Sequence, residues 1–248
     1  ILSIYSIWYN IYYIHQLKGG MFMKNIKVQY LYNSGFSVET ENHHLIFDCY
    51  KGSPKLNHKD TIVLVSHSHP DHYNPGILKW KNKKENMKYI FSSDIQVKEP
   101  DESICFLSPD EEISIYDMSI KTLGSTDLGV SFLVNVDNLT LFHAGDLNWW
   151  YWWDDTPEEI RVMEEAFKRE IHKLNEKKID IAFFPVDPRL RHNYCLGGEY
   201  FIKEIKPEFF VPMHFGDDYG TIKSFMEKVK NYPTKVVEIS AKGQEIYL

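Results

Sequence analysis

A dense group of metal-binding side chains at positions 66–72, Ser-His-Ser-His-Pro-Asp-His, constrains this chain more than any other feature. It directly follows the apolar segment 62–65, which is typical of a buried strand. Three imidazoles and one carboxylate in a loop after a strand can supply ligand pairs to two adjacent metal ions. Imidazole and carboxylate ligands favour Zn, Mn or Fe over Ca or Mg. The segment therefore predicts a metal-dependent hydrolase in an α/β domain.

A simpler explanation exists for a lone His-x-His pair, which is usually part of a solvated loop or a core histidine bonded to the backbone. Here a third histidine and an aspartate follow in the same loop, directly after β-branched residues. The number and spacing of these groups indicate metal binding.

Two later segments carry further candidate ligands, Phe-His-Ala-Gly-Asp at 142–146 and Val-Pro-Met-His-Phe at 211–215. With the first segment, they resemble the signature of the metallo-β-lactamase superfamily over roughly residues 23–248. The resemblance is nearest to the branch of small hydrolases that includes L-ascorbate-6-phosphate lactonase. It implies an α/β fold, a four-layer αββα sandwich, with a one- or two-metal site at the edge of the sheets.

The resemblance also implies a role for each candidate ligand. One metal ion is assigned to His67 and His69, the other to Asp71, His72 and His214, and Asp146 is the carboxylate that bridges both. A bridging carboxylate is physically sensible, because two cations roughly 3.5–4 Å apart need a shared anionic ligand to offset their repulsion. The implied cofactors are one or two divalent metal ions, Zn or Mn, with Fe as a further candidate.

The chain departs from the family pattern at one position. The family has a third histidine ligand for the first metal, but no histidine lies between His72 and His143 here. The corresponding segment is Leu-Gly-Ser-Thr-Asp at 123–127, so Asp127 is the candidate substitute, and its oxygen would favour Mn or Fe. Two alternatives stay open: the first site is weak or empty, or His192 reaches in. His143 itself is expected to be buried or to support the ligands.

A tryptophan-rich segment follows Asp146 directly, with four tryptophans at positions 149–153. We predict that Trp149 and Trp150 form an apolar wall or lid over the metals, which would exclude water and shape the pocket. The alternative is that these rings pack as a small core beneath the loop.

A second candidate for binding substrate is the segment 185–192, which follows a buried strand as catalytic loops do. Arg189 is a candidate clamp for a carboxylate or phosphate, because a guanidinium bonds both in bidentate fashion. Its alternative is a structural ion pair with Asp187. His192 is a further candidate for contact with substrate.

By the family resemblance, the chain hydrolyses a small-molecule ester, lactone or phosphoester with a metal-bound hydroxide. The catalytic residues are Asp71, which would orient the hydroxide or pass a proton to the leaving group, and Asp146. A phosphodiesterase or nuclease is the alternative within the enzymes. A non-catalytic metal-binding relative is a third hypothesis, which the missing histidine keeps open.

Composition limits the partners. The 248 residues are enough for one domain, and the net charge of −7 argues against a nucleic acid or an anionic membrane. Three widely spaced cysteines without a Cys-x-x-Cys pair indicate a reducing compartment. We therefore expect a cytoplasmic enzyme with a small-molecule substrate, and a homo-oligomer is not excluded.

The first 22 residues are apolar and aromatic, and the chain does not begin with Met. Residues 18–20, Lys-Gly-Gly, fit the codons of a bacterial ribosome-binding sequence just before Met21 and Met23. We predict that residues 1–22 are a non-native leader and that 23–248 form the hydrolase domain. A short apolar extension that anchors the chain is the alternative.

Hydrophobic patterning predicts alternating strands and helices. The pair Asp137-Asn138 predicts a hairpin turn. Thr156, Pro157 and Glu159 predict the start of a helix that reaches Leu174. Short helices are expected at 75–80, 198–205 and 222–229. The expected strands are 26–31, 36–40, 45–48, 62–65, 89–91, 104–107, 113–115, 119–123, 130–136, 139–143, 179–184, 209–211, 236–237 and 244–248.

Overall fold

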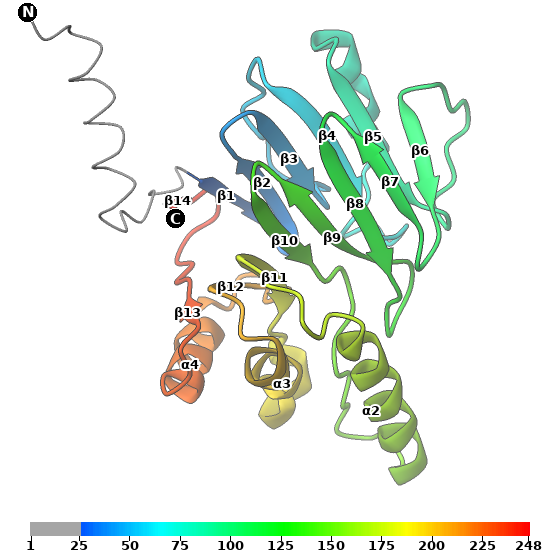
Figure 1. Ribbon diagram of the computed structural model, residues 1–248. Coiled ribbons are helices and arrows are strands. Elements are labelled where there is room, and N and C mark those ends of the chain that lie inside the picture. The colour runs from blue at the N-terminus through cyan, green and yellow to red at the C-terminus, as the bar shows by residue number, and fades with distance from the viewer. Residues whose placement is uncertain (1–25) are drawn as a thin grey trace, which may run out of the picture.

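Two seven-stranded β-sheets pack face to face in the computed structural model, which describes residues 26–248 (Figure 1). Helices lie outside the sheets, so the predicted four-layer αββα sandwich is confirmed. The predicted leader at residues 1–22 lies outside the described residues. No helix between residues 26 and 248 is both long enough and apolar enough to cross a lipid bilayer.

The first sheet has the strand order β14-β1-β2-β3-β4-β5-β6. Its strands are β1 (Lys27–Tyr32), β2 (Gly35–Glu39), β3 (His43–Phe47), β4 (Asp60–Val65), β5 (Met87–Ser92), β6 (Ile104–Leu107) and β14 (Glu245–Tyr247). β1, β2 and β3 form an antiparallel meander, and β3 to β6 run parallel. The central strand β4 is buried on both faces, as a continuous apolar run predicts.

The second sheet has the order β13-β12-β11-β10-β9-β8-β7. Its strands are β7 (Glu112–Ile115), β8 (Met118–Leu123), β9 (Ser131–Val136), β10 (Leu139–His143), β11 (Ile181–Pro185), β12 (Phe209–Met213) and β13 (Lys235–Val236). β9 and β10 form the predicted hairpin. Its turn residues Asp137 and Asn138 have φ of 46° and 58°, as a tight type I′ turn requires.

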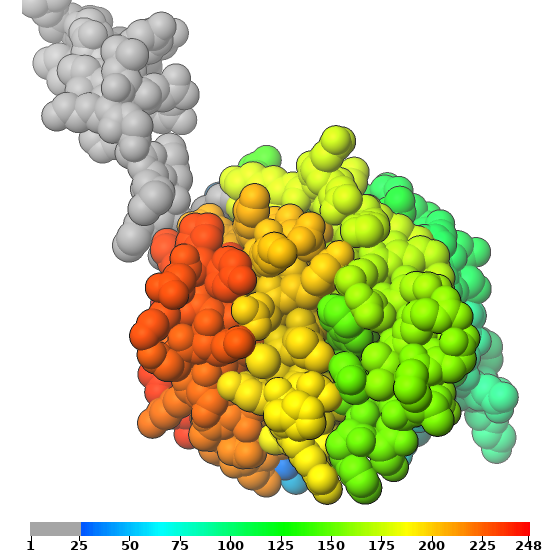
Figure 2. All heavy atoms as spheres, turned by 90° about the horizontal axis from the view of Figure 1, so that it is seen from below, coloured from blue at the N-terminus to red at the C-terminus, as the bar shows by residue number. Residues whose placement is uncertain are grey.

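Three helices cover the outer face of the second sheet: α2 (Pro157–His172), α3 (Leu196–Ile205) and α4 (Tyr219–Val229). Figure 2 views this face from below, and the three helices lie side by side across it. The rings of Phe142 and Phe184 stack on Phe201 of α3, and Phe210 packs against Phe225 of α4. Because side chains alternate between the two faces of a strand, one set of aromatic rings from β10, β11 and β12 packs against the helices.

The helix α2 begins as the sequence predicts. The Thr156 hydroxyl accepts the Glu159 backbone N–H, and the Glu159 carboxylate accepts the Thr156 N–H in return, which completes a capping box. Phe167 and Ile171 are buried against the sheet, whereas Met163 is only partly buried. The exposed start of the helix thus leaves an apolar side chain near the loops that follow the strands.

The outer layer on the first sheet is thinner, since it is built around the 3₁₀ helix η1 (Pro75–Lys83) instead of an α-helix. Its one buried side chain, Ile77, packs on a small apolar cluster with Val63, Tyr89 and Phe91. A polar segment with a single buried anchor gains little from packing, which suits a short 3₁₀ helix. The predicted helix at 75–80 is present, but it is tighter and longer.

The ends of six strands define one edge of the sandwich. β3 and β4 run parallel, as do β10, β11 and β12, and β8 has the same direction because β9 is antiparallel to both β8 and β10. Each of these strands is followed by a polar residue at this edge: Asp48, His67, Asp127, Asp146, Asp187 and His214. The topology therefore gathers side chains from across the sequence.

Acid is expected to destabilise the fold through His44. This imidazole is fully buried, its Nε2 lies 2.7 Å from Ser37 Oγ, and burial lowers its pKa from 6.5 to about 4. The folded pKa lies below the unfolded value, so this contribution to stability is complete above pH 6.5 and declines as pH falls toward 4. Between pH 7.5 and 4.5 we expect native protein to lose about 2 kcal/mol more unfolding free energy than His44→Leu.

Urea unfolding of both proteins at the two pH values measures this difference. An equal loss in the native protein and in His44→Leu would contradict the assignment.

Candidate metal centre

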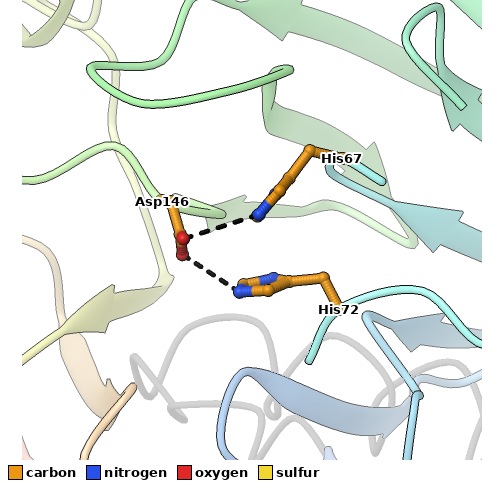
Figure 3. A group of neighbouring side chains, drawn as sticks. All are labelled: His67, His72 and Asp146. Atoms are coloured by element: carbon orange, nitrogen blue, oxygen red, sulfur yellow. Dashed lines mark ion pairs between the residues drawn. The ribbon is translucent and has the colours of Figure 1, made fainter. Parts of the chain in front are cut away.

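Asp146 lies at the centre of the site, in the loop after β10. Its Oδ1 is 3.1 Å from His72 Nε2 and 3.4 Å from His214 Nε2, and its Oδ2 is 3.5 Å from His67 Nε2. Figure 3 shows His67 and His72 aimed at the two oxygens of this carboxylate. One carboxylate thus faces imidazoles from two sides, which is the arrangement a bridging ligand needs.

One group of potential ligands comprises Asp71, His72 and His214, whose ligand atoms all lie within 4.8 Å of one another. Asp71 Oδ2 is 3.9 Å from His72 Nε2 and 3.8 Å from His214 Nε2. Both imidazoles are buried, whereas the Asp71 side chain is 45% exposed. This is the set that the sequence assigns to the second metal, and its ligand role remains a prediction.

A second group comprises His69, Asp127 and Asp146, again within 4.8 Å. His69 Nδ1 is 3.8 Å from Asp127 Oδ2 and 3.0 Å from His67 Nε2. The fold therefore brings Asp127 next to His69 and Asp146, as the predicted substitute for a third ligand requires, and its ligand role stays a prediction. The His69 and Asp127 side chains are 44% and 48% exposed, so both are accessible to solvent, as Asp71 is in the other group.

The residues present fit divalent metal ions, as three buried atoms show. His72 Nε2, Asp146 Oδ1 and His214 Nε2 are inaccessible to solvent and have no hydrogen-bond partner. Buried polar groups in folded proteins are almost always satisfied, because an unsatisfied one costs about 1–3 kcal/mol. A cation would satisfy three such atoms together, and the nitrogen and carboxylate donors suit Zn, Mn or Fe.

The electrostatics of the centre favour positive charge. Burial lowers the pKa of His72, but the carboxylates of Asp146 and Asp48 outweigh it and raise the pKa to about 10. Burial raises the pKa of Asp146, yet the imidazoles of His214 and His72 hold it well below its usual range. The carboxylates thus create a negative potential at the imidazole nitrogens, which a metal cation would neutralise.

Asp48 supports two of the candidate ligands from below. Its Oδ2 lies 2.8 Å from His72 Nδ1 and accepts the Ser66 hydroxyl at 2.7 Å, while its Oδ1 accepts the Ser66 N–H at 2.7 Å. The Ser66 hydroxyl lies 2.9 Å from His67 Nδ1. A carboxylate that accepts the Nδ1 proton leaves Nε2 free to bind a metal. Our sequence analysis did not identify Asp48.

Asp187 has the same relation to His214, whose Nδ1 lies 2.9 Å from Asp187 Oδ2. Arg189 donates to Asp187 through Nε and Nη2, so the structural ion pair named as the alternative for Arg189 is present. The Arg189 side chain is nevertheless 60% exposed and borders the cavity over the metal centre. In this geometry Arg189 can hold Asp187, which positions His214, and still contact a substrate.

Gly129 allows the ligand loop to pack closely. A Cβ at this position would lie 2.1 Å from the Ser66 carbonyl oxygen and 2.5 Å from His67 Cβ, and φ is +75°. We expect Gly129→Ala to lower the free energy of unfolding by about 3 kcal/mol, through both the clash and the backbone strain. Urea denaturation provides the measurement.

Gly243→Ala is the matched control, because φ is +78° there but nothing lies within 4 Å of the added Cβ. This substitution should lower the free energy of unfolding by only about 1 kcal/mol, which is the strain of a left-handed residue. Equal losses in the two variants would show that the close approach at Gly129 has no energetic weight.

A cavity of about 320 Å³ lies over the centre. Its lining is His69, Asp71, Thr126, Asp127, Asp146, Trp150, Trp152, Met163, Arg189 and His214. Trp150 is buried, donates from Nε1 to the Asp146 carbonyl at 2.9 Å and meets the His214 ring edge-on at 5.6 Å. Trp150 thus borders the cavity, where we predict an apolar wall.

Trp149 is not part of that wall, contrary to our expectation. Its ring packs 5.8 Å from Phe167 and 5.9 Å from Tyr200, beneath the loop. Trp152 lines the cavity in its place and stacks on Trp150 at 5.8 Å. The two adjacent rings thus lie on different sides of the loop, Trp150 at the cavity and Trp149 against α2 and α3.

His192 also lies outside the cavity lining and outside every group of potential ligands, and it is exposed. It belongs to the 3₁₀ segment η2 (Pro188–Asn193), which is interrupted by Arg191 at φ 53° and ψ −121°. His143 is fully buried, stacks on Phe47 at 4.9 Å and places Nε2 2.9 Å from the Ser34 carbonyl oxygen. It thus fills the core, as expected.

Comparisons with known proteins identify the family of this chain. Residues 27–150, half of the chain, match the family described as "Beta-lactamase superfamily domain". A UPF0173 metal-dependent hydrolase from Bacillus thuringiensis subsp. konkukian is 25% identical, with 86% of this chain and 97% of the relative covered. The UPF0173 metal-dependent hydrolase YtkL from Bacillus subtilis is 24% identical, with 77% and 86% covered.

Two solved structures show the same fold. The metallo-β-lactamase fold protein YhfI from Bacillus subtilis superposes with a TM-score of 0.62 at 14% identity, over 91% of this chain and 100% of that one. Igni18, a metallo hydrolase from Ignicoccus hospitalis, gives 0.62 at 15% identity, over 90% and 98%.

Proposed function

This chain belongs to the metallo-β-lactamase superfamily and is a metal-dependent hydrolase, and we propose that it acts on a small-molecule ester, lactone or phosphoester. The observation that carries the proposal is the convergence of His72 Nε2, Asp146 Oδ1 and His214 Nε2 beneath a cavity of about 320 Å³; all three are buried and, within residues 26–248, have no hydrogen-bond partner. That volume suits a small molecule.

Metal ions in this centre would activate a water molecule and polarise the bond to be cleaved. We assign them to two sets of residues that share Asp146: His67, His69 and Asp127 on one side, and Asp71, His72 and His214 on the other. The set with Asp127 has one more carboxylate in place of the histidine of the family pattern. This favours Mn or Fe on that side more than Zn.

Asp71 is the residue we assign to proton transfer. Its side chain borders the cavity and is half-exposed, and Asn33 Nδ2 donates to its Oδ2 at 3.3 Å. A carboxylate that is oriented yet accessible can hold the attacking water and then pass a proton to the leaving group. Trp150 and Trp152 limit the access of bulk water from the other side.

Arg189 is the candidate for contact with an anionic group of the substrate. Its Nη2 and Nε are engaged with Asp187, but the guanidinium edge borders the cavity. Hydrolysis of a lactone, the reaction of the branch that includes L-ascorbate-6-phosphate lactonase, is the first form of the proposal to test, because a lactone leaves one product and needs no second pocket for a leaving group.

The test is turnover of three probes, methyl acetate, γ-butyrolactone and bis(p-nitrophenyl) phosphate, by protein loaded with Zn²⁺ or Mn²⁺. We expect hydrolysis of at least one probe, its loss after chelation with EDTA, and its recovery when metal returns. Absence of turnover with all three probes in the metal-loaded protein would contradict the proposal.

A further inference from the structure

A second cleft of about 540 Å³ opens beside the metal centre, between the tryptophan-rich loop and the start of α2. It shares five lining residues with the cavity over the metals, so the two are continuous: Thr126, Asp127, Trp150, Trp152 and Met163. A substrate that reacts at the metals can therefore extend into this cleft.

Apolar side chains form much of the cleft surface. Trp150 and Trp152 stack with an interplanar angle of 5°, and Met163 and Ala166 line the cleft from α2. Val162 also lines it and is 52% exposed, which makes it one of three large hydrophobic residues exposed between residues 26 and 248. Exposed apolar surface beside a reactive centre indicates a binding site more than a stability feature.

The charges of the cleft are all acidic; of its four acids, Asp127 belongs to the candidate metal centre, and the other three have partners in the protein. Asp155 accepts the Trp152 N–H at 2.9 Å, Glu159 closes the capping box at Thr156, and Glu158 pairs with Arg161. Among residues 26–248, no lysine or arginine lines the cleft. An anionic group of a substrate would thus be repelled by these carboxylates and would find no cationic side chain to pair with. An uncharged group would avoid this repulsion.

We propose that this cleft binds an uncharged, apolar arm of the substrate, with Trp152 and Met163 as the main contacts. The proposal rests on the proposed hydrolase function and narrows its substrate class to molecules that carry an alkyl or aryl group next to the cleaved bond. A small metabolite charged at every end would leave the apolar surface uncovered.

A series of methyl esters tests the proposal on the metal-loaded full chain, with acid release followed by pH-stat. Methyl acetate reports whether the proposed hydrolysis occurs at all. We expect kcat/KM for methyl hexanoate to exceed that for methyl acetate by about tenfold or more, since the added methylenes are buried in the cleft. Hydrolysis of methyl acetate without this preference would overturn the cleft proposal and leave the hydrolase function intact.

A charge introduced into the cleft should reverse the preference. In Met163→Lys we expect the ratio of kcat/KM for monomethyl adipate to that for methyl hexanoate to rise about tenfold over native, because the lysine pairs with the terminal carboxylate. Damage to the fold cannot produce such a gain for one substrate. Trp153→Ala is the control on the same loop, because Trp153 is 57% exposed and lies outside the cleft lining. In Trp153→Ala the ratio of kcat/KM for monomethyl adipate to that for methyl hexanoate should equal the native ratio.

Binding is measured independently of turnover by an NMR titration with 1-hexanol. We expect shifts at the Met163 methyl group and the Ala166 amide, and none at the Trp153 indole. An absence of shifts at Met163 and Ala166 would overturn the proposal, even for a protein that hydrolyses no methyl ester.

Discussion

Asp146→Asn is expected to reduce hydrolysis by about a thousandfold or more, which is the largest effect of any single substitution in this account. The carboxylate faces three imidazoles, with Oδ1 3.1 Å from His72 Nε2 and 3.4 Å from His214 Nε2. A neutral amide removes the anion that both halves of the centre share, so metal binding should fall as well. Initial rates and metal per chain, determined by inductively coupled plasma mass spectrometry, give the two readouts.

Asp180→Asn is the matched control for this substitution. Asp180, directly before β11, is also a buried carboxylate, but it accepts the Thr140 N–H at 2.8 Å, near the opposite end of β10. It should retain native metal content and native rates in its folded fraction. If Asp146→Asn kept its metal and its activity, the assignment of Asp146 as the shared ligand would be wrong.

Asp48→Asn is expected to weaken metal binding by about ten- to a hundredfold, although Asp48 is not itself a candidate ligand. If the amide oxygen keeps the bond to the Ser66 N–H, the amide nitrogen faces His72 Nδ1. Because an amide nitrogen only donates, His72 Nδ1 must then accept the hydrogen bond. The imidazole proton therefore moves to Nε2, the atom that would bind the metal. Competition with a fluorescent chelator measures the change in metal affinity.

Asp137→Asn separates this effect from a general loss of stability. Asp137 accepts hydrogen bonds from Thr40 and Asn42 at the β9–β10 turn, at the far end of the strands from the metal centre. This variant should unfold at lower urea concentration than native protein and bind metal with native affinity. An unchanged metal affinity in Asp48→Asn would refute the proposed control of the His72 tautomer.

Local sequence signals predict much of this fold because they depend on neighbours in the chain. The capping box at Thr156 and the turn at Asp137-Asn138 involve residues within a few positions of one another, and both are present. The loop at 66–72 could also be predicted locally, because its candidate ligands all follow the end of the same strand. The 3₁₀ form of η1 was not predicted, because periodicity alone does not separate a short 3₁₀ helix from an α-helix.

Residues that act through distant partners were missed. Asp48 precedes His72 by 24 positions and Asp187 precedes His214 by 27, so nothing local links each pair. A signal was nonetheless available: both aspartates lie within two residues of the end of a buried strand, as His67 and His214 do. Only the parallel arrangement of β3 with β4, and of β11 with β12, shows that these strand ends meet.

The orientation of side chains in loops also could not be predicted from the sequence. Trp149 and Trp150 are adjacent in a loop without regular periodicity, so sequence alone does not say which ring faces the metals. His192 follows Arg191, whose positive φ changes the direction of the segment. Asp127 had the right chemistry and position after a strand, and the structure places it beside His69.

Metal per chain in native protein and in Asp127→Ala tests the central claim most directly. Both proteins are purified without chelator, offered Zn²⁺ or Mn²⁺, desalted and analysed by inductively coupled plasma mass spectrometry. The account predicts about two metal ions per native chain and about one in the variant, because His69 and Asp127 belong to one half of a centre that Asp146 bridges. A native chain that retains no metal under either condition would contradict it.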